Sequence, residues 1–243
     1  MRIAVEIAVQ DVVGVRIALA EGADRVEVCS ALGMGGLTPS AALIHGAVAL
    51  ARRSNREGFV HVLVRPRGGG FVYDADELAT TLADVRFARE AGAAGVVVGA
   101  LTEAAQVDTD AVLRIVEAAG PLQVTFHRAM DVVADPFAAA EELIALGVTR
   151  VLTSGRAPRS IEGVATIRAL SQAVAGRLEV MAGGGVSVGD IPALAATGID
   201  AVHLSARDTA QGAPSGPGGG DTGYDITDPM TVHDALAMAV LAR

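Results

Sequence analysis

The chain has 243 residues and a formal net charge of −9, with 51% hydrophobic and 19% charged residues. The length suits one (β/α)8 barrel of about 250 residues or two smaller domains, so the sequence pattern has to decide between them. The acidic balance, without a basic stripe, argues against a nucleic-acid partner, and the lack of an apolar run of about 18 residues argues against a membrane span.

The composition favours a cytoplasmic protein with an aliphatic interior. Aromatic residues make up only 3% of the chain and Trp is missing, which suits a buried parallel sheet rich in Val, Ile, Leu and Ala. The N-terminal run MRIAVEIAVQD carries Glu6, so we expect no secretory signal. The single cysteine, Cys29, excludes an internal disulfide, and no Cys/His cluster is present to build a closed zinc site.

A repeated junction organises the chain into alternating helices and strands. A helix rich in Ala and Leu is followed by Gly and then by a Val/Ile/Leu-rich strand, and this Gly falls where a helix end needs a positive φ. The five junction glycines are Gly22, Gly92, Gly120, Gly147 and Gly198. The predicted strands cover residues 3–8, 25–29, 60–65, 95–99, 123–127, 150–154, 179–182 and 201–205.

Helix-start residues follow most of these strands. Ser, Thr and Asp are favoured at helix N-caps and Pro in the first helical turn. The predicted starts are Thr38-Pro39, Asp74, Asp108, Asp135-Pro136, Ser187 and Asp228-Pro229. Eight strands alternating with helices predict a single (β/α)8 TIM barrel over residues 1–243, with a doubly wound open sheet as the alternative.

One segment breaks this regularity. Residues 211–222 read QGAPSGPGGGDT, which is too rich in Gly and Pro for a helix or strand. We expect a flexible loop at about residues 211–223, before a closing helix over residues 228–241. It would lie at the C-terminal ends of the strands, either as a lid or as an insertion without a role.

Polar residues gather at the predicted C-terminal ends of the strands. Residues two apart on a strand share a face, so they point in pairs toward the barrel mouth. A binding site is expected there, with a charge network that only fills the barrel as the alternative. The candidates for catalysis are Glu6, Glu27, Arg65 and His127, where the carboxylates and the imidazole would handle protons.

Glycine-rich turns follow three of the later strands. They read TSG at residues 153–155, AGGGV at 182–186 and HLSAR at 203–207. Backbone N–H groups of such turns form anion cradles, and barrels often bind phosphate after strands seven and eight. A tight turn without a ligand is the alternative. The candidate anion-binding residues are Arg67, Ser154, Gly155, Gly183, Gly184, Gly185, His203 and Ser205.

The motifs taken together resemble the CutC family. The stretches that carry this resemblance are VEIAV, GADRVEVCSALGMGGLTPS, VHVLVRPRGGGFVY, VTFHRAMD, RVLTSG, MAGGGV and VHLSAR, in this order from about residue 5 to residue 207. The resemblance implies a (β/α)8 barrel, a cytoplasmic location, a homodimer and a link to copper(I) in copper homeostasis.

The chain departs from the family at one position that matters for copper. CutC proteins commonly carry a cysteine in a stretch like EVCV after the first strand's glutamate, whereas this chain reads EIAV and has Ala8 there. Cys29 is then the one thiolate, and Met34 or Met181 would have to assist it. Cys29 is otherwise a nucleophile or a small core residue.

Three functional hypotheses follow. The first is a copper-homeostasis protein that binds copper(I) through Cys29. The second is an enzyme of unknown reaction on a small phosphate- or carboxylate-bearing substrate. The third, a barrel that serves only as a scaffold for partners, has no sequence feature in its favour.

Overall fold

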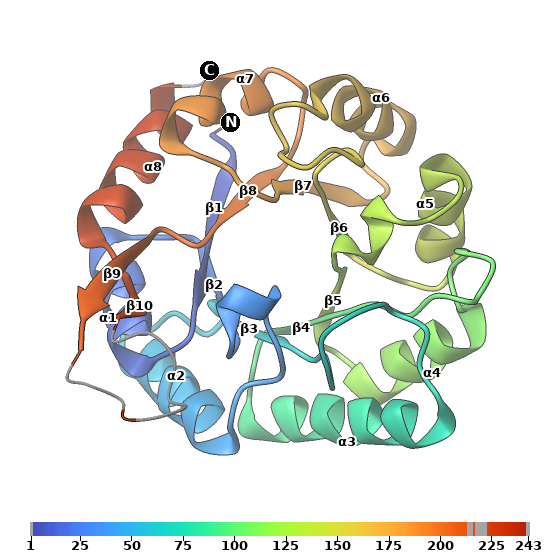
Figure 1. Cartoon of the computed structure of the whole chain (residues 1–243), viewed down its shortest axis with the longest axis horizontal. Coiled ribbons are helices and arrows are strands. Elements are labelled where there is room, and N and C mark those ends of the chain that lie inside the picture. The colour runs from blue at the N-terminus through green and yellow to red at the C-terminus, as the bar shows by residue number, and fades with distance from the viewer. Residues whose placement is uncertain (1, 213–215, 217–222, 242–243) are drawn as a thin grey trace.

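Eight parallel strands close into a barrel in the computed structural model, which describes residues 2–212, 216 and 223–241 (Figure 1). Each strand pairs with the next, and the first pairs with the eighth, so the barrel has no free edge. The TIM-barrel prediction is confirmed, and the open-sheet alternative is wrong. The strands are β1 (Ala4–Val9), β2 (Arg25–Val28), β3 (Val60–Leu63), β4 (Gly95–Val98), β5 (Gln123–Phe126), β6 (Arg150–Thr153), β7 (Glu179–Gly183) and β8 (Ala201–Leu204).

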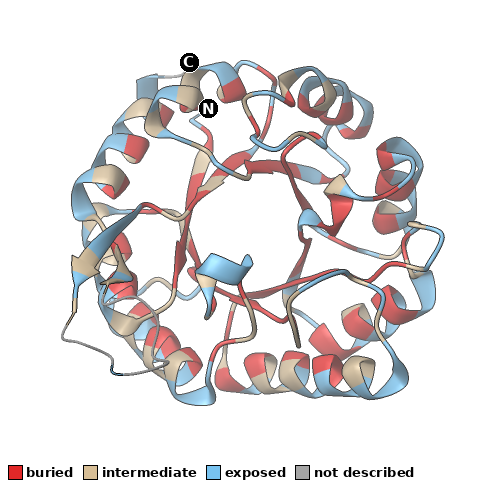
Figure 2. Ribbon diagram, viewed as in Figure 1, coloured by how far each residue is buried: buried red, intermediate tan, exposed pale blue. Residues whose placement is uncertain are grey.

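A ring of helices covers the outside of the barrel. Their inner faces are buried against the strands and their outer faces are exposed (Figure 2). None of the helices in the described part of the chain has the length and apolar character needed to cross a membrane. They are α1 (Val12–Glu21), α2 (Ala41–Arg53), α3 (Ala75–Ala91), α4 (Thr109–Ala119), α5 (Pro136–Ala145), α6 (Val164–Val174), α7 (Ile191–Ala195) and α8 (Pro229–Leu241).

The helix ends follow the sequence signals closely. All five junction glycines have positive φ, and at Gly22 and Gly92 the backbone N–H closes the preceding helix. Asp74, Asp108 and Asp135 cap their helices as expected. One start is wrong, because Ser40 rather than the Thr38-Pro39 pair caps α2.

Thr38 has another structural role. Its hydroxyl donates to the Arg65 carbonyl at 3.1 Å and accepts from the Arg65 N–H at 3.0 Å, which ties the loop after β2 to the end of β3.

The barrel interior combines apolar clusters with buried charge. Cys29, Leu63 and Val97 form one small cluster. The Arg150 side chain, 1% exposed, bonds Glu179 and Thr125 toward the N-terminal ends of the strands. Because Arg150 has an oppositely charged partner and a polar one, the barrel can hold this charge in its interior.

Glycines on β4 and just beyond it make room for two imidazoles. A Cβ placed on Gly95 would lie 2.4 Å from Nδ1 of His61, and one placed on Gly99 would lie 2.4 Å from Cε1 of His127. The small residues on this strand therefore set where both histidine rings can lie inside the barrel.

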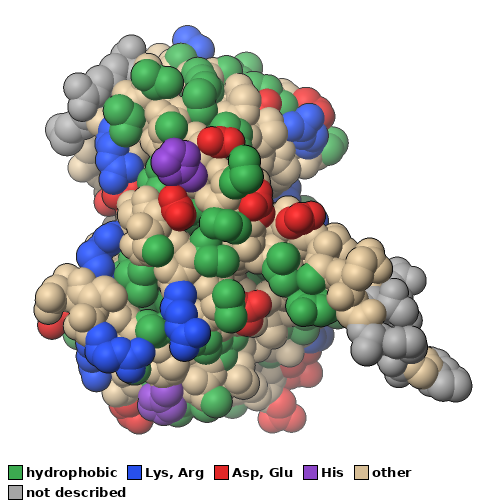
Figure 3. Space-filling model, turned by 90° about the vertical axis from the view of Figure 1, so that its left-hand side faces the viewer, with side chains coloured by type: hydrophobic (Ala, Val, Ile, Leu, Met, Phe, Trp, Pro, Cys, Tyr) green, Lys and Arg blue, Asp and Glu red, His purple; other side chains and the backbone are tan. Residues whose placement is uncertain are grey.

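An antiparallel pair of strands follows β8. β9 (Arg207–Gln211) pairs with β10 (Gly223–Thr227), and the arm they form stands out from the barrel (Figure 3). This arm was not predicted, and it places Gln211 and Gly223, the two ends of the expected loop, in β9 and β10. The rest of that loop, at positions 213–215 and 217–222, lies outside the described residues.

We predict that Gly95→Ala destabilises the barrel by about 1–3 kcal/mol, because the new methyl group would overlap His61 and the backbone carbonyl of Gln123. Urea unfolding measures the change. Gly58→Ala is the matched control, since a Cβ there meets nothing within 4 Å. Equal stability of the two variants would contradict the packing described here.

Candidate functional site

A cavity of about 210 Å³ opens at the C-terminal ends of the strands. It is smaller than the 300–1,000 Å³ typical of sites for drug-sized ligands, so it suits a small molecule. Its position agrees with the expectation for a barrel. The predicted site residues that line it are Glu27, Arg65, His127, Gly184, Gly185, His203 and Ser205, and its apolar wall includes Leu32, Leu63, Phe71, Leu152, Val186 and Leu204.

A chain of three ionisable side chains runs from the barrel centre to this cavity. The fully buried Glu6 accepts a hydrogen bond from Nε of Arg25 at 3.1 Å and shares one with Nδ1 of His203 at 2.9 Å. Nε2 of His203 lies 4.0 Å from Oε2 of Glu27. Glu27 therefore forms the cavity end of a carboxylate–imidazole–carboxylate row.

The three groups hold different protonation states. Burial alone would raise the pKa of Glu6, but the hydrogen bond from His203 and the charges of His203 and Arg25 hold it well below its usual range. His203 has its pKa raised, because the two carboxylates outweigh burial. Burial, with repulsion from Glu6, raises the pKa of Glu27 to about 7. Glu27 can therefore take up or release a proton near neutral pH.

His127 lines the cavity and carries its one N–H group on a buried nitrogen. Its Nδ1 accepts a hydrogen bond from the Ala129 N–H at 3.1 Å, which places the ring hydrogen on Nε2. Nε2 is buried and has no partner in the described structure. Burial and the charge of Arg65 lower the pKa of His127 to about 3, so the ring stays neutral. This lowered pKa favours a role as a hydrogen-bond donor over the acid–base role expected from the sequence.

Arg65 brings a buried positive charge to the same cavity. Within the described residues, its guanidinium donates to the backbone carbonyls of Met34 at 3.2 Å, Gly36 at 3.1 Å and Gly69 at 2.7 Å. Its Nε has no partner, and it forms no ion pair with a carboxylate of the described residues. Arg65 is 7% exposed, so its charge is balanced neither by water nor by an acidic side chain.

A second guanidinium, that of Arg128, lines the cavity. Its Nε donates to Asp131 at 2.7 Å and its Nη2 to Ser154 at 3.0 Å. Asp131 is itself held by Thr153 at 2.6 Å and by the Ser154 N–H at 2.9 Å. Arg128 and Asp131 were not among the predicted site residues. The signal available was the RAMD stretch directly after a strand, where a short helical turn (Arg128–Asp131) forms.

The glycine turn after β7 faces the same space. The Gly184 carbonyl accepts from the N–H and hydroxyl of Ser160, which turns it away from the cavity. The N–H groups of Gly184, Gly185 and Val186 have no backbone acceptor within the described residues. Gly184 also has φ +107, and a Cβ there would lie 2.9 Å from Cζ of Arg128. Glycine at this position thus lets Arg128 pack directly over the turn.

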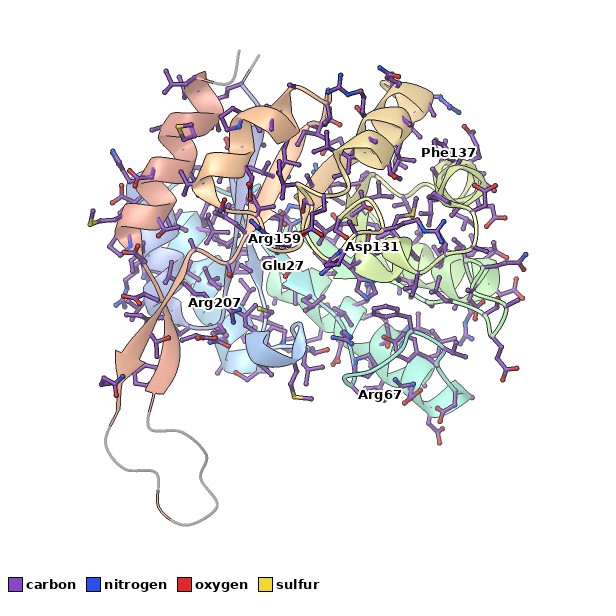
Figure 4. All side chains as sticks on the ribbon, turned by 45° about the horizontal axis from the view of Figure 1, so that its top comes forward. Glu27, Arg67, Asp131, Phe137, Arg159 and Arg207 are labelled. Atoms are coloured by element: carbon purple, nitrogen blue, oxygen red, sulfur yellow. The ribbon has the colours of Figure 1, made fainter. Side chains whose placement is uncertain are left out.

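Arg67 does not belong to the cavity. It pairs with Glu77 on the surface, and its side chain is 41% exposed. Figure 4 shows Glu27 near the middle of the barrel and Arg67 toward its rim. The expected place of Arg67 at the barrel mouth is wrong, because β3 ends at Leu63 and the strand alternation does not extend to residue 67.

Other predicted anion ligands have structural partners instead. Gly183 leaves room for Leu152 and His203, and Gly155 packs against the Gly163 carbonyl. The buried Ser154 hydroxyl bonds Asp131 at 3.0 Å and the Ala157 carbonyl at 2.6 Å. None of the three lines the cavity. Their contribution is to position the loops that do.

Cys29 is a core residue in this structure. Its side chain is fully buried in the cluster with Leu63 and Val97, and it does not line the cavity. Burial, together with the charge of Glu27, raises the pKa of the thiol above its usual range. The thiol is therefore poorly suited to act as a nucleophile.

Glu6, Glu27 and His203 are close enough to be considered for a metal ion. One ligand atom from each lies within 4.8 Å of the others. Both oxygens of Glu6 are already engaged, by Arg25 and by His203. This leaves Glu27 and Nε2 of His203, too few protein ligands for a well-defined site of the common divalent ions.

Comparison with known proteins matches one family over most of the chain. Residues 3–208 match the model of the CutC family. A family protein CutC of Xylella fastidiosa is 43% identical over 240 residues, covering 96% of this chain and 87% of that protein. The corresponding protein of Xanthomonas axonopodis pv. citri is 43% identical over 244 residues, covering 96% and 99%.

A solved structure agrees with these matches. The CutC structure from Streptococcus agalactiae, whose name links it to copper homeostasis, superposes with a TM-score of 0.77 at 32% identity. It covers 84% of this chain and 98% of that one. The family resemblance seen in the sequence motifs is thereby confirmed.

We predict that Glu27→Gln has a larger free energy of unfolding than the unmodified protein. This difference, the gap between the two proteins, should widen as the pH rises from 5 to 7. In this window the unfolded Glu27 loses its proton while the folded, buried carboxyl, facing Glu6 and His203, keeps it. The gap should grow by up to about 1.4 kcal/mol per pH unit and level off above pH 7.

Urea unfolding at pH 5, 6, 7 and 8 measures this gap. The exposed Glu103→Gln is the control and should show a difference independent of pH. A constant gap for Glu27→Gln would show that its carboxyl titrates like an exposed one.

Proposed function

The chain belongs to the CutC family, and from this premise and the chemistry of the cavity we propose that it is an enzyme acting on a small anionic substrate by acid–base catalysis. One observation carries the proposal. Arg65 is a buried cation without a carboxylate partner among the described residues, and it lines the same cavity as Glu27, a carboxyl that titrates near neutrality.

The electrostatics of the cavity favour an anion. Arg65 and Arg128 bring two positive charges to it, and His127 adds a neutral N–H donor. Leaving a guanidinium buried without a counter-charge costs several kcal/mol, and a bound phosphate or carboxylate would remove much of that cost. The free amides of the turn at residues 184–186 add donors for a second anionic oxygen.

Glu27 supplies the acid–base function. A group whose pKa lies near the working pH is present in both protonation states and transfers protons efficiently in either direction. Burial raises the pKa of Glu27 and the charge of Glu6 raises it further, while the charge of His203 opposes part of the shift. Sites with such perturbed carboxyls in a cleft are commonly catalytic.

Copper(I) binding fits these residues poorly. Copper(I) favours two or three thiolate or thioether ligands. Cys29 is the one cysteine of the chain, and its thiol is buried with a raised pKa. Met34 is 61% exposed and does not line the cavity, and the sulfur of Met181 accepts from Arg25 at 3.7 Å. We therefore assign copper(I) no step in the function, and a cytoplasmic location and a homodimer stay predictions from the family resemblance.

We predict that the protein binds oxalate and inorganic phosphate and that Arg128→Met weakens both by about tenfold or more, because one of the two cavity cations is lost. Arg65→Met should weaken them further, although it also removes hydrogen bonds to three loop carbonyls. Isothermal titration calorimetry measures the affinities.

Arg67→Met is the matched control for these variants. It removes a guanidinium two residues from Arg65 that lies outside the cavity, and it should leave both affinities unchanged. An unmodified protein that binds neither anion, or an Arg67→Met effect as large as that of Arg128→Met, would contradict the proposed function.

We also predict that anaerobic titration with copper(I) gives well below one tightly bound ion per chain. Competition against a copper(I) chelator provides the measurement, and Cys29→Ser should leave the result unchanged. Stoichiometric binding that disappears in Cys29→Ser would establish the copper alternative.

A further inference from the structure

Taking the proposed function as its basis, we infer that the cavity is built for enolate chemistry: Glu27 removes a proton from a carbon next to a carbonyl, while Arg65 and His127 donate hydrogen bonds to the carbonyl oxygen. The inference names the substrate class as small carbonyl compounds that carry an anionic group. It rests on where the unpaired donors and the carboxyl lie.

Arg65 and His127 both line the cavity, and each has one buried side-chain nitrogen without a hydrogen-bond partner among the described residues. These nitrogens are Nε of Arg65 and Nε2 of His127. Both side chains pack on Phe71, whose ring centroid lies 4.8 Å from that of His127 and 5.2 Å from Cζ of Arg65. Buried N–H groups are almost always paired in folded proteins, so two unpaired ones on side chains that pack on the same ring indicate a place for a ligand oxygen. Such a pair is suited to hold a developing oxyanion.

The imidazole of His127 is fixed in the form that this role requires. The Ala129 N–H holds Nδ1 as an acceptor, and Gly99 leaves the space in which the ring lies. Because the ring stays neutral beside Arg65, it stabilises the oxygen by a hydrogen bond rather than by charge. A neutral imidazole is a much weaker acid than an imidazolium, so its proton stays on the ring as the enolate forms.

The base faces these donors across the barrel mouth. Glu27 lies on β2 and His127 directly follows β5, three strands away around a ring of eight. Within the described part of the chain, no hydrogen bond reaches the Glu27 carboxylate, and its nearest charged neighbour is Nε2 of His203 at 4.0 Å. A carboxylate without partners at the edge of a cavity is free to reach a substrate C–H.

A third region would hold the substrate's anionic group. Arg128, braced by Asp131, lies against the turn at residues 184–186, and Ser205 lines the cavity beside it. The cavity volume of about 210 Å³ lies below the range typical of sites for drug-sized ligands. This limits the substrate to a few carbons plus a carboxylate or phosphate group, as in a 2-oxo acid or a hydroxycarbonyl phosphate.

The proposed step balances without a further reactant. The Glu27 carboxylate takes the proton from the α-carbon, the C–H electron pair becomes the C=C bond, and the carbonyl π pair moves to the oxygen held by Arg65 and His127. The protonated Glu27 then returns the proton to the same carbon or to its neighbour. Return of the proton to the same carbon exchanges the hydrogen of that carbon or inverts its configuration. Return to the neighbouring carbon isomerises the compound.

The test is hydrogen exchange into substrates in D2O, followed by proton NMR with pyruvate, 2-oxobutyrate, dihydroxyacetone phosphate and glyceraldehyde 3-phosphate. At least one compound should exchange its α C–H faster with protein than in buffer alone. Glu27→Gln should lower this rate by at least about 100-fold because the base is lost. His127→Ala should lower it by about 100-fold, as expected for removal of one oxyanion donor.

The variants and a binding measurement make the outcomes distinct. His127→Gln keeps an amide N–H near the position of Nε2 and should therefore restore part of the exchange rate. If His127 had only a structural role, the His127→Gln and His127→Ala variants would exchange at the same rate. Oxalate, which resembles the enolate of a 2-oxo acid, should bind more tightly than inorganic phosphate, and His127→Ala should remove this preference.

Exchange that persists in both Glu27→Gln and His127→Ala would overturn the inference. So would the absence of exchange in all four compounds together with oxalate binding no tighter than phosphate, although anion binding itself would then still support the proposed function. Absence of any anion binding would overturn both.

Discussion

The fold of the barrel depends on pairing the charged side chains that lie inside its closed sheet. A parallel barrel has no edge and no water at its centre, so each ionised group there needs a partner. Glu6 meets this requirement with Arg25 on one side and His203 on the other. Arg150 meets it with Glu179, Thr125 and Gln123. Neighbouring strands supply these partners. The charge pairs therefore form only in the observed strand register, and they stabilise that register in turn.

The same requirement accounts for the site, because charged side chains at the mouth of the barrel lack some of their hydrogen-bond or ion-pair partners. Toward the mouth, Glu27 has no hydrogen-bond donor among the described residues, and Arg65 has backbone carbonyls but no carboxylate. Both groups are buried, and they line one cavity. Buried groups that lack part of their partners on two walls of one space indicate a place where a bound molecule would supply them. The proposed enzymatic function follows from this contrast: charged side chains in the barrel interior have partners, whereas those at the mouth lack some of theirs.

The sequence predicted the architecture because its signals are local. Helix-ending glycines such as Gly22 and caps such as Asp74 act within one turn of chain, and the apolar strands repeat between them. The site was predicted in part. Strand alternation correctly placed Glu27 and His127 but failed at Arg67, because β3 ends before it. The bracing of Arg128 by Asp131, the neutrality of His127 and the partners of Glu6 depend on contacts between distant strands, which no local pattern encodes.

A crystal structure of the protein grown with oxalate at neutral pH tests the central claim most directly. We expect one oxalate in the cavity, with an oxygen within hydrogen-bond distance of both Nε of Arg65 and Nε2 of His127, and with the Glu27 carboxyl facing it. A cavity filled only by water, or a metal ion held by Glu27 and His203 without an anion on Arg65, would contradict the account.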